Sequence, residues 1–427
     1  MLGRSTLGAL SAALLVLVSA TPASASAPAP RGSLVLVGGA LADGNDAVYD
    51  EIIHRAGGSG ARIGIITAAS VPASQDPDAH DPAKCANSEC NGAYYAALFK
   101  QHGAADAAWI PVDLDHRDAA ESDAVAAQVR GMTGFFFGGG DQYRYVTTLL
   151  RGDRHTDSKV MAAIRARFRD GAVISGSSAG AQIASGPDMV TGGDSYEGLR
   201  DGSRPGYFDD PSVLGYLPAG GFGLLTSGLL DTHTGVQGRE GRSLRLAADT
   251  GHDRVYALDE NTALVVDHPR SPGETLRVLG EHGVTVLDLS HARPKARPCG
   301  WSITDVRYDY LTTGDRYTPT ARAITPAPGS RPTTPADRTP VPANDDVFSS
   351  PRNPAGSPYS LLRTARALAS NATTRATTAH TWETGPRFDV RIAKSRETGV
   401  WAKPGAVPPS VLGLRLDVGS AECTSRG

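Results

Sequence analysis

Apolar runs that end in glycine alternate with amphipathic stretches through the first half of this chain. The runs are continuously apolar, as in strands whose two faces are both buried. Helical periodicity lies between them, for example at residues 46–56 and 119–129. This alternation predicts an α/β fold in which a mostly parallel sheet is flanked by helices. The predicted strands lie within residues 34–39, 61–70, 107–114, 131–142 and 171–180.

Glycine-rich turns follow three of these predicted strands. They read GG at residues 38–39, GGGDQ at 138–142 and GSSAG at 176–180. In open parallel sheets, ligands bind beyond the carboxyl ends of the strands. We therefore expect the functional site at this edge of the sheet.

The pattern changes in the second half of the chain. The sequence DRVYALDENTALVVD at residues 253–267 predicts a β-hairpin. Residues 319–358 are rich in Pro and Thr and lack periodicity, which predicts an exposed loop or linker. Beyond them, residues 357–370 predict a helix, and residues 387–393 and 411–418 alternate as strands do.

The length of 427 residues suggests two or three domains, or one large α/β unit with an appendage. Too little apolar sequence follows the Pro/Thr-rich stretch for an independent core, so the C-terminal extension is expected to pack on the main domain. The predicted organisation is a signal peptide at 1–27, an α/β domain at 32–318, a loop or linker at 319–358 and an extension at 359–427.

The N-terminus has the features of a secretory signal peptide. Arg4 precedes an apolar stretch from Leu7 to Val18, and two A-x-A cleavage patterns end at Ala25 and Ala27. The apolar stretch is shorter than the roughly 20 residues that a membrane span needs, which disfavours an anchor. No later segment has the character of a span. We expect a secreted protein without membrane attachment after signal cleavage.

Four cysteines in an exported chain predict two disulfides, for which three pairings exist. Cys85 and Cys90 bracket a short segment and suit a small closed loop, which leaves Cys299 and Cys423 to tie the last part of the chain together. A metal site at Cys85 and Cys90 is disfavoured because no second Cys/His pair stands at ligand spacing. A formal charge of −3 leaves no electrostatic footprint for nucleic acid.

The turn at residues 176–180 satisfies the G-x-S-x-G pattern between an apolar strand and a small-residue helix. Only Ser178 has glycine two positions away on both sides, so Ser178 is the candidate nucleophile. Ser175 precedes the turn and is expected to face the core, and Ser177 sits at the x position. The alternative is a tight turn that binds phosphate or nothing. For catalysis, the N–H of Ala179 is placed to stabilise an oxyanion.

A serine nucleophile needs a base and a group that orients it. His233 follows the apolar sequence GFGLLTSGLLD, at the point where a strand would end. Glu260 lies within an Asp-Glu-Asn cluster between apolar flanks, and buried carboxylates are almost never left unpaired. The order is thus Ser, His, Glu. An α/β-hydrolase would instead place its acid before a late histidine, with an HGGG-type segment near the start.

The sequences GGGDQ, GSSAG, DTHTGVQGREGR and LDENTALVV resemble, in order and spacing, the cyanophycinase and aspartyl dipeptidase family, serine peptidase family S51. The likeness runs from about Gly32 to Asp288. It implies a fold like that of the class I glutamine amidotransferases, which is flavodoxin-like; amidotransferases proper carry cysteine at the elbow. It also implies Ser178 as nucleophile, His233 as base and Glu260 as its partner, with an oxyanion hole from Ala179 and Gly140.

The same resemblance implies a set of residues around an aspartate-type substrate. Arginine suits this role because its planar fork can bind a carboxylate with two hydrogen bonds. The chain departs from the cyanophycinase pattern at two positions, where it has Thr232 and Gln237. The loss of one arginine weakens the case for cyanophycin itself. The implied substrate-binding residues are Gln142, Asp231, Thr232, Gln237, Arg239, Arg242 and Asn261.

These observations predict a secreted serine hydrolase that cleaves amide bonds at aspartyl residues, with cyanophycin or related β-linked peptides as substrate. No metal or cofactor is needed for this chemistry. The alternatives are an aspartyl dipeptidase or secreted esterase on the same triad, or an inactive binding homologue. The expected partner is a peptide or polymer substrate, and the oligomeric state stays open, a homodimer included.

Overall fold

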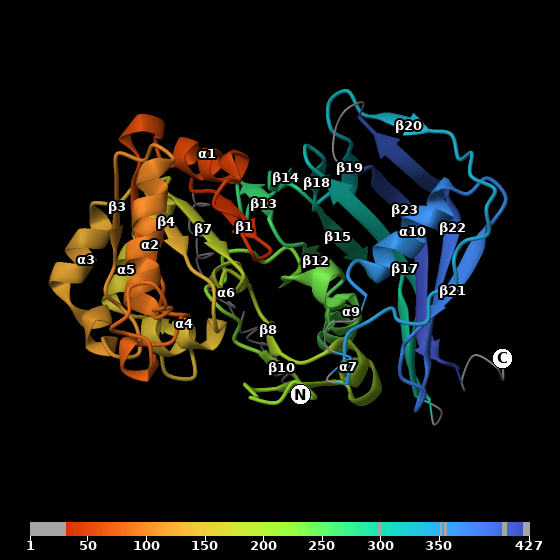
Figure 1. The fold of residues 1–427 in the computed structure, drawn as a ribbon, viewed down its shortest axis with the longest axis horizontal. Coiled ribbons are helices and arrows are strands. Elements are labelled where there is room, and N and C mark those ends of the chain that lie inside the picture. The colour runs from red at the N-terminus through yellow and green to blue at the C-terminus, as the bar shows by residue number, and fades with distance from the viewer. Residues whose placement is uncertain (1–30, 298–299, 351, 354–356, 404–407, 422–427) are drawn as a thin grey trace, which may run out of the picture.

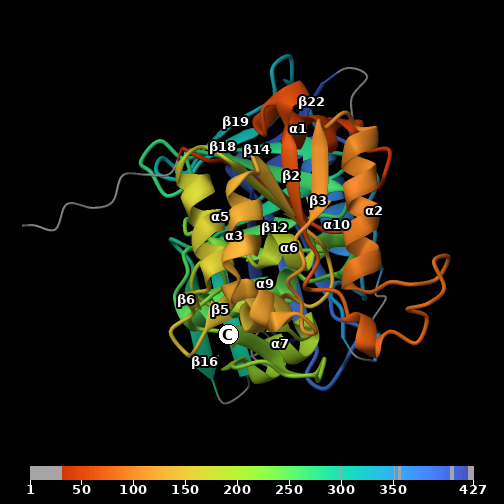
Figure 2. The same cartoon turned by 90° about the vertical axis from the view of Figure 1, so that its left-hand side faces the viewer.

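The computed structural model describes residues 31–297, 300–350, 352–353, 357–403 and 408–421. Within them, two large sheets follow one another along the long axis of the molecule (Figure 1). Helices cover the first sheet on both sides, as the perpendicular view in Figure 2 shows for α2 on one side and α3 and α5 on the other. The signal peptide expected at 1–27 lies outside the described residues.

The predicted strands form the parallel half of the first sheet. Their order is β3-β2-β4-β7-β1, and each neighbouring pair is parallel. Alternate side chains enter opposite cores, Leu36 and Phe137 on one face and Val37 and Phe136 on the other. The continuous apolar runs thus reflect burial on two faces, and the predicted α/β fold class is confirmed. The strands are β1 (Leu34–Val37), β2 (Arg62–Ile66), β3 (Asp106–Trp109), β4 (Gly134–Phe137) and β7 (Val173–Ser177).

Amphipathic helices supply the other side of each core. On the face of the sheet that carries Val37, the helices contribute Ile52 and Phe99 to the core. On the face that carries Leu36, they contribute Val129 and Ile164. Each helix begins after a residue whose side chain accepts a backbone N–H of the first turn, which satisfies a donor that the helix itself cannot pair. The helices are α1 (Asp46–Arg55), α2 (Ser88–Gln101), α3 (Asp123–Arg130), α4 (Gln142–Leu149) and α5 (Lys159–Arg169).

Antiparallel strands extend the first sheet beyond β1. β13 pairs with β1, and β14, β18 and β19 follow in order. The prediction of a β-hairpin at residues 253–267 is wrong. Its two strands do not pair with each other, because β12 belongs to the second sheet and β13 to the first. Both strands are buried on both faces, so each needs neighbours of its own, and the chain changes sheet at Asn261, whose φ is 51°. The strands are β12 (Arg254–Leu258), β13 (Thr262–Asp267), β14 (Thr275–Gly280), β18 (Arg316–Thr318) and β19 (Ala323–Thr325).

The second sheet is built from both the predicted main domain and the C-terminal extension. Its order is β11-β12-β15-β17-β23-β22-β20, with β16 on β17 and β21 on β22. Val255, Ile303, Leu361 and Leu414 share one core, so the extension completes a core that the earlier strands begin. The additional elements are β11 (Leu229–Asp231), β15 (Gly283–Asp288), β16 (Arg293–Arg297), β17 (Gly300–Thr312), β20 (Arg331–Thr333), α10 (Ser360–Ser370), β21 (Ala376–His380), β22 (Phe388–Ala402) and β23 (Ser410–Ser420). The expected linker at 319–358 thus contains the short strands β19 and β20.

The segment between the two sheets carries short elements (Figure 1). β8, β9 and β10 form a small sheet, and β5 (Leu150–Arg151) pairs with β6 (Thr156–Asp157). Single 3₁₀ turns lie at Gly58–Gly60, Ala73–Gln75 and Arg117–Glu121, the last of them at the start of the helix expected at 119–129. The short elements are α6 (Ala179–Gln182), β8 (Met189–Gly192), α7 (Ser195–Asp201), β9 (Ser203–Pro205), β10 (Leu214–Leu217), α8 (Thr234–Gln237) and α9 (Glu240–Thr250).

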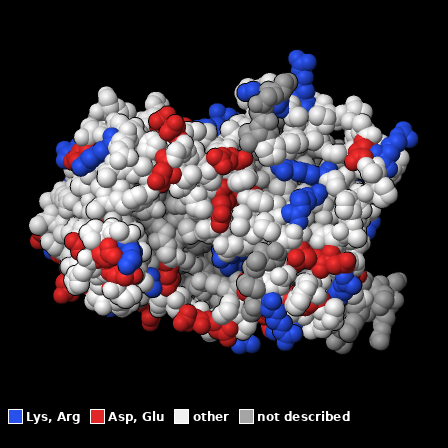
Figure 3. All heavy atoms as spheres, viewed as in Figure 1, with Lys and Arg blue, Asp and Glu red and all other residues white. Residues whose placement is uncertain are grey.

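The predicted Cys85–Cys90 disulfide is confirmed. Cys299 and Cys423 lie outside the described residues, so their expected pairing stays a prediction. Among the helices that the structure describes, none combines the length and apolar character of a membrane span. On the face shown in Figure 3, acidic and basic side chains are interspersed with neutral ones.

Candidate active site

Ser178 occupies the turn between β7 and α6. Its φ of 56° and ψ of −119° are rare outside glycine, and its N–H donates to the carbonyl of Val37 at 3.0 Å. A Cβ on Gly176 would lie 2.2 Å from the Gly180 oxygen, and one on Gly180 would lie 1.9 Å from the Phe137 oxygen. Both flanking positions therefore require glycine, which is the geometry of a nucleophile elbow.

The two neighbouring serines are buried. The Ser175 hydroxyl is fully buried and donates to the Phe135 carbonyl at 2.8 Å, as expected for a core position. Ser177 is 4% exposed, whereas Ser178 is partly exposed. Of the three hydroxyls, Ser178 is the one that a substrate can approach.

His233 follows β11 of the second sheet, and its side chain lies next to Ser178. It adopts a left-handed conformation with φ of 56°, and its N–H donates to the Gly38 carbonyl at 2.7 Å. A Cβ on Gly39 would lie 2.1 Å from the imidazole Cε1 of His233. Glycine is therefore required at Gly39 because the histidine ring packs directly on its backbone, and at Gly38 because a Cβ there would lie 2.2 Å from the Asp259 oxygen.

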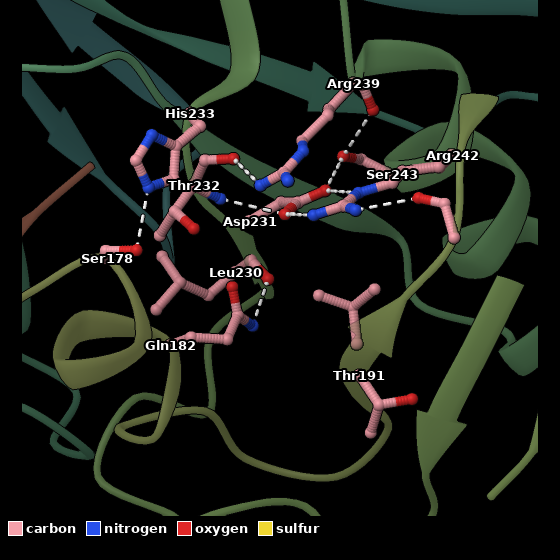
Figure 4. Close-up of polar contacts among 12 residues, drawn as sticks. Ser178, Gln182, Thr191, Leu230, Asp231, Thr232, His233, Arg239, Arg242 and Ser243 are labelled. Atoms are coloured by element: carbon pink, nitrogen blue, oxygen red, sulfur yellow. Dashed lines mark hydrogen bonds and ion pairs between the residues drawn. The ribbon is translucent and has the colours of Figure 1, made fainter. Parts of the chain in front are cut away.

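The imidazole of His233 joins Ser178 to Glu260. Nε2 lies 2.7 Å from the Ser178 Oγ, and Nδ1 lies 2.6 Å from a Glu260 carboxylate oxygen. Burial lowers the pKa of His233, although the hydrogen bond that Glu260 accepts from its imidazole acts to raise it. The imidazole is therefore neutral near pH 7 and able to accept the serine proton. Figure 4 shows the contact between His233 and Ser178.

Backbone groups of two turns surround the Ser178 side chain. Ala179 is the first residue of α6, where N–H groups have no partner within the helix. A Cβ on Gly139 would lie 3.5 Å from the Ser178 Cβ, so this glycine approaches the serine closely. Gly140 has a φ of 134°, and a Cβ there would lie 2.2 Å from the Ala69 oxygen.

Asp231, two residues before His233, forms a buried ion pair with Arg242. The Arg242 Nε and Nη2 donate to the two Asp231 oxygens at 2.9 and 2.7 Å, and Nη1 donates to the Gly193 carbonyl at 2.8 Å. Ser243 donates to the same carboxylate. Burial alone would raise the pKa of Asp231, but the adjacent Arg242 holds it below its usual value. Both side chains are thus engaged with the protein, as Figure 4 shows.

Arg239 differs from Arg242 in its partners. The one hydrogen bond that its guanidinium makes within the described residues runs from Nη1 to the Thr232 carbonyl at 3.1 Å, and no carboxylate there lies within ion-pair distance. Burial, together with the neighbouring positive charge of Arg242, lowers the pKa of Arg239 to about 9. The guanidinium remains charged at neutral pH and lies near His233 without a directly paired anion (Figure 4).

The other predicted site residues lie around this centre in different roles. Gln142 donates its amide to the carbonyls of Val190 and Thr191 at 3.0 and 3.2 Å. The Asn261 side chain accepts from the Asn45 amide at 2.8 Å and from a backbone N–H, so it holds the loop after β1. Thr232 is buried and Gln237 is partly exposed at the end of α8.

Two acidic residues near the histidine had no predicted role. Asp259 is buried, accepts the Gly235 N–H at 2.8 Å and the Tyr310 hydroxyl at 2.7 Å, and burial raises its pKa to about 6. Asp194 accepts the Ser349 hydroxyl at 3.2 Å and lies close enough to Arg242 and Arg239 to feel their charge. The position of Asp259 in the acidic cluster before β13 was a usable signal, whereas nothing local marked Asp194.

No group of three or more His, Cys, Asp or Glu side chains within the described ranges is arranged to hold a metal ion.

Comparison with known proteins adds independent evidence. Residues 34–271 match the model of peptidase family S51. The cyanophycinase of Trichormus variabilis is 30% identical over 310 residues, which cover 70% of this chain and 89% of the relative. The cyanophycinase of Geminocystis herdmanii is 27% identical over 67% of this chain and 93% of that protein.

A solved structure of a peptidase from an acI-B1 Actinobacterium is also similar, with 19% identity and a TM-score of 0.43 over 67% of this chain and 96% of that chain. The family match spans the turns that carry Gly139, Ser178, His233 and Glu260. The chain belongs to peptidase family S51 and is a serine-type peptidase.

Proposed function

We propose that this chain is a secreted, cyanophycinase-like serine peptidase that hydrolyses amide bonds at aspartyl residues. In the proposed mechanism, His233 accepts the proton of Ser178 through Nε2 as the serine oxygen attacks the aspartyl carbonyl. Glu260 keeps the imidazole in the required orientation through Nδ1. The two contacts of 2.7 and 2.6 Å on opposite sides of the ring support this division of roles.

The reaction then follows the usual course of an acyl-enzyme. The tetrahedral intermediate collapses when His233 returns the proton to the leaving amine, and an ester remains on Ser178. Water attacks this ester with His233 again acting as base, and the free carboxylate product leaves. The backbone N–H of Ala179 and the Gly139–Gly140 turn are the proposed donors to the oxyanion, because both border the Ser178 side chain.

The proposed specificity for aspartyl groups rests on Arg239. Arg239 is partly exposed and its guanidinium has no paired carboxylate among the described residues, so a substrate carboxylate could reach it and supply the missing partner. Arg242 was expected to share this role, but its bonds to Asp231 and Gly193 leave Arg239 as the better candidate. The unpaired Arg239 next to His233 is the observation that carries the proposal.

The choice of cyanophycin over shorter peptides rests on the named relatives, which are cyanophycinases. Gln237 stands at a position where the family pattern has an arginine, so the site carries one positive charge fewer. A small aspartyl peptide needs one carboxylate contact, whereas a polymer needs further contacts along its length. Secretion rests on the N-terminal sequence pattern.

One incubation separates these substrates. Purified protein is mixed with insoluble cyanophycin and, separately, with matched α- and β-aspartyl dipeptides, and the products are identified by mass, with Ser178→Ala as the control. We expect β-aspartyl products that disappear in the control. Release from dipeptides alone would favour an aspartyl dipeptidase, and hydrolysis of a neutral ester alone would favour an esterase. Equal turnover by wild type and Ser178→Ala would overturn the proposal.

A further inference from the structure

The C-terminal extension reaches the segment that carries the catalytic histidine. We call residues 233–242 the histidine loop, since they run from His233 to Arg242. Tyr359, directly before α10, donates its backbone N–H to the Gly235 carbonyl at 2.5 Å. A Cβ on Gly235 would lie 2.4 Å from the Tyr359 ring, so the aromatic side chain packs directly against the loop backbone.

The second half of the histidine loop is contacted by the segment before α10. The Ser349 N–H donates to the Gly238 carbonyl at 3.2 Å, and the same carbonyl accepts the Ser195 hydroxyl. A Cβ on Gly241 would lie 3.1 Å from the Phe348 ring. The start of the extension and the segment before it thus contact the loop on both sides of its central glycine, Gly238. Phe348, Ser349 and Tyr359 all lie beyond the residues that match the family model, which end at 271.

The backbone of Tyr359 is itself in an unfavourable conformation. Its φ is 56°, in the left-handed region, which bulky residues rarely adopt and which costs on the order of 1 kcal/mol or more. Its ring centre lies 5.0 Å from that of His282, with the two ring planes tilted by 35°, and its hydroxyl has no hydrogen-bond partner among the residues that the structure describes. The ring and the backbone N–H, rather than the hydroxyl, therefore hold the contact with the loop.

Tyr359 contacts the same loop residue, Gly235, as a layer of polar side chains made of Asp259, Tyr310 and Arg366. Asp259 links Gly235 of the loop to Tyr310 of β17, and the Arg366 guanidinium of α10 lies 5.0 Å from the centre of the Tyr310 ring. Burial, followed by the charges of Asp259, Glu260 and Glu240, raises the pKa of Tyr359. The layer therefore joins the extension to the turn that carries Glu260 as well as to the loop that carries His233.

We propose that Tyr359 is a positioning residue of this peptidase, through which the C-terminal extension holds the histidine loop and so sets the contact between His233 and Ser178. The inference rests on the proposed triad but not on the proposed substrate. A displacement of about 1 Å at a catalytic base can cost about a hundredfold in rate, so the support of a four-residue helix such as α8 matters.

The experiment measures the reactivity of Ser178 with a fluorophosphonate, which needs an activated serine but no substrate recognition. Rates of labelling are compared for wild type, Tyr359→Ala and Tyr359→Phe, alongside kcat and KM on the best substrate found. We expect Tyr359→Ala to lower the labelling rate and kcat about 10- to 100-fold, with KM changed little. Tyr359→Phe keeps the ring and should restore both rates to near wild type.

Leu368→Ala is the matched control, because Leu368 lies in α10, the helix that Tyr359 precedes, and is buried in the core of the second sheet. It should lower the unfolding temperature at least as much as Tyr359→Ala while the folded protein keeps the wild-type labelling rate. If Tyr359→Ala fails to fold, Tyr359→Leu replaces it with the same expectation. Wild-type labelling in a folded Tyr359 variant without the ring would overturn the proposal. Absence of labelling in the wild type would instead overturn the triad itself.

Discussion

Arg242 and Asp231 form a two-pronged ion pair in which both carboxylate oxygens accept from one guanidinium, at 2.9 and 2.7 Å. The side chains are 6% and 0% exposed, so this pair belongs to the interior. Its bonds join α9 to the end of β11, directly before Thr232 and His233. Two arginines that look alike in the sequence therefore have different tasks, and they can be separated by experiment.

We predict that Arg242→Met lowers stability more than it lowers substrate recognition. The change leaves the Asp231 carboxylate buried and unpaired, which costs about 3–5 kcal/mol. Urea unfolding measures the loss, and the double variant Asp231→Asn/Arg242→Met should recover part of it. A stability within experimental error of wild type would show that Arg242 does not support the fold.

We predict that Arg239→Met acts on recognition instead. Loss of a charge-assisted hydrogen bond to a substrate carboxylate should cost about 1.5–3 kcal/mol, or roughly 10- to 150-fold in kcat/KM on aspartyl substrates. An uncharged ester should lose much less, and urea unfolding should be unchanged or slightly improved. Equal losses on charged and uncharged substrates would remove the argument for aspartyl specificity.

We predict that Ser178→Ala lowers turnover at least about 10³-fold, as expected for a triad nucleophile. Ser177→Ala should remain active. Ser175→Ala should also remain active but less stable, because it leaves the Phe135 carbonyl without the hydroxyl that it accepts in the core. Steady-state rates on one substrate compare the three variants. An inactive Ser177→Ala beside an active Ser178→Ala would contradict the assignment of the elbow.

We predict an acid limb of kcat/KM with a midpoint below the ordinary histidine value of about 6.5. Burial lowers the pKa of His233, and the base must be neutral, so activity persists as the pH falls until that lowered pKa is reached. Glu260→Gln removes the carboxylate that raises this pKa, so the midpoint should move further down while kcat/KM falls about 10²- to 10⁴-fold. A midpoint above 7 in the wild type would contradict the buried, neutral imidazole.

We predict a second disulfide between Cys299 and Cys423 in protein exported by its host. Cys85–Cys90 already forms one pair, and an oxidising compartment disfavours free thiols. Peptide mapping without reductant should recover both linked pairs. Detection of free thiols in the exported protein would argue against secretion through an oxidising environment.

The sequence predicted the parts of the fold that local chemistry determines. Continuous apolar runs identified β1, β4 and β7 because both faces of each are buried, and Gly176 and Gly180 identified the elbow because any larger residue would meet the backbone. The acidic cluster before β13 also pointed to Glu260, which lies 2.6 Å from His233.

The sequence could not predict which neighbours each element would choose. The run at residues 253–267 has the pattern of a hairpin, but its two strands find partners far away along the chain, β15 for one and β1 for the other. The sequence also could not predict which partner a polar side chain would bind. Arg242 points to Asp231 and Asn261 to Asn45, and neither contact leaves a mark in the local pattern.

The change of sheet at Asn261 has a consequence for how this enzyme fails. Ser178 follows a strand of the first sheet, His233 follows a strand of the second, and Glu260 stands where the chain crosses between them. The hydrogen bond between Ser178 and His233 therefore depends on the position of the two sheets relative to each other. A small rotation of one sheet on the other would separate these residues while every strand kept its own partners, so mild heating should abolish activity before circular dichroism records any loss of structure.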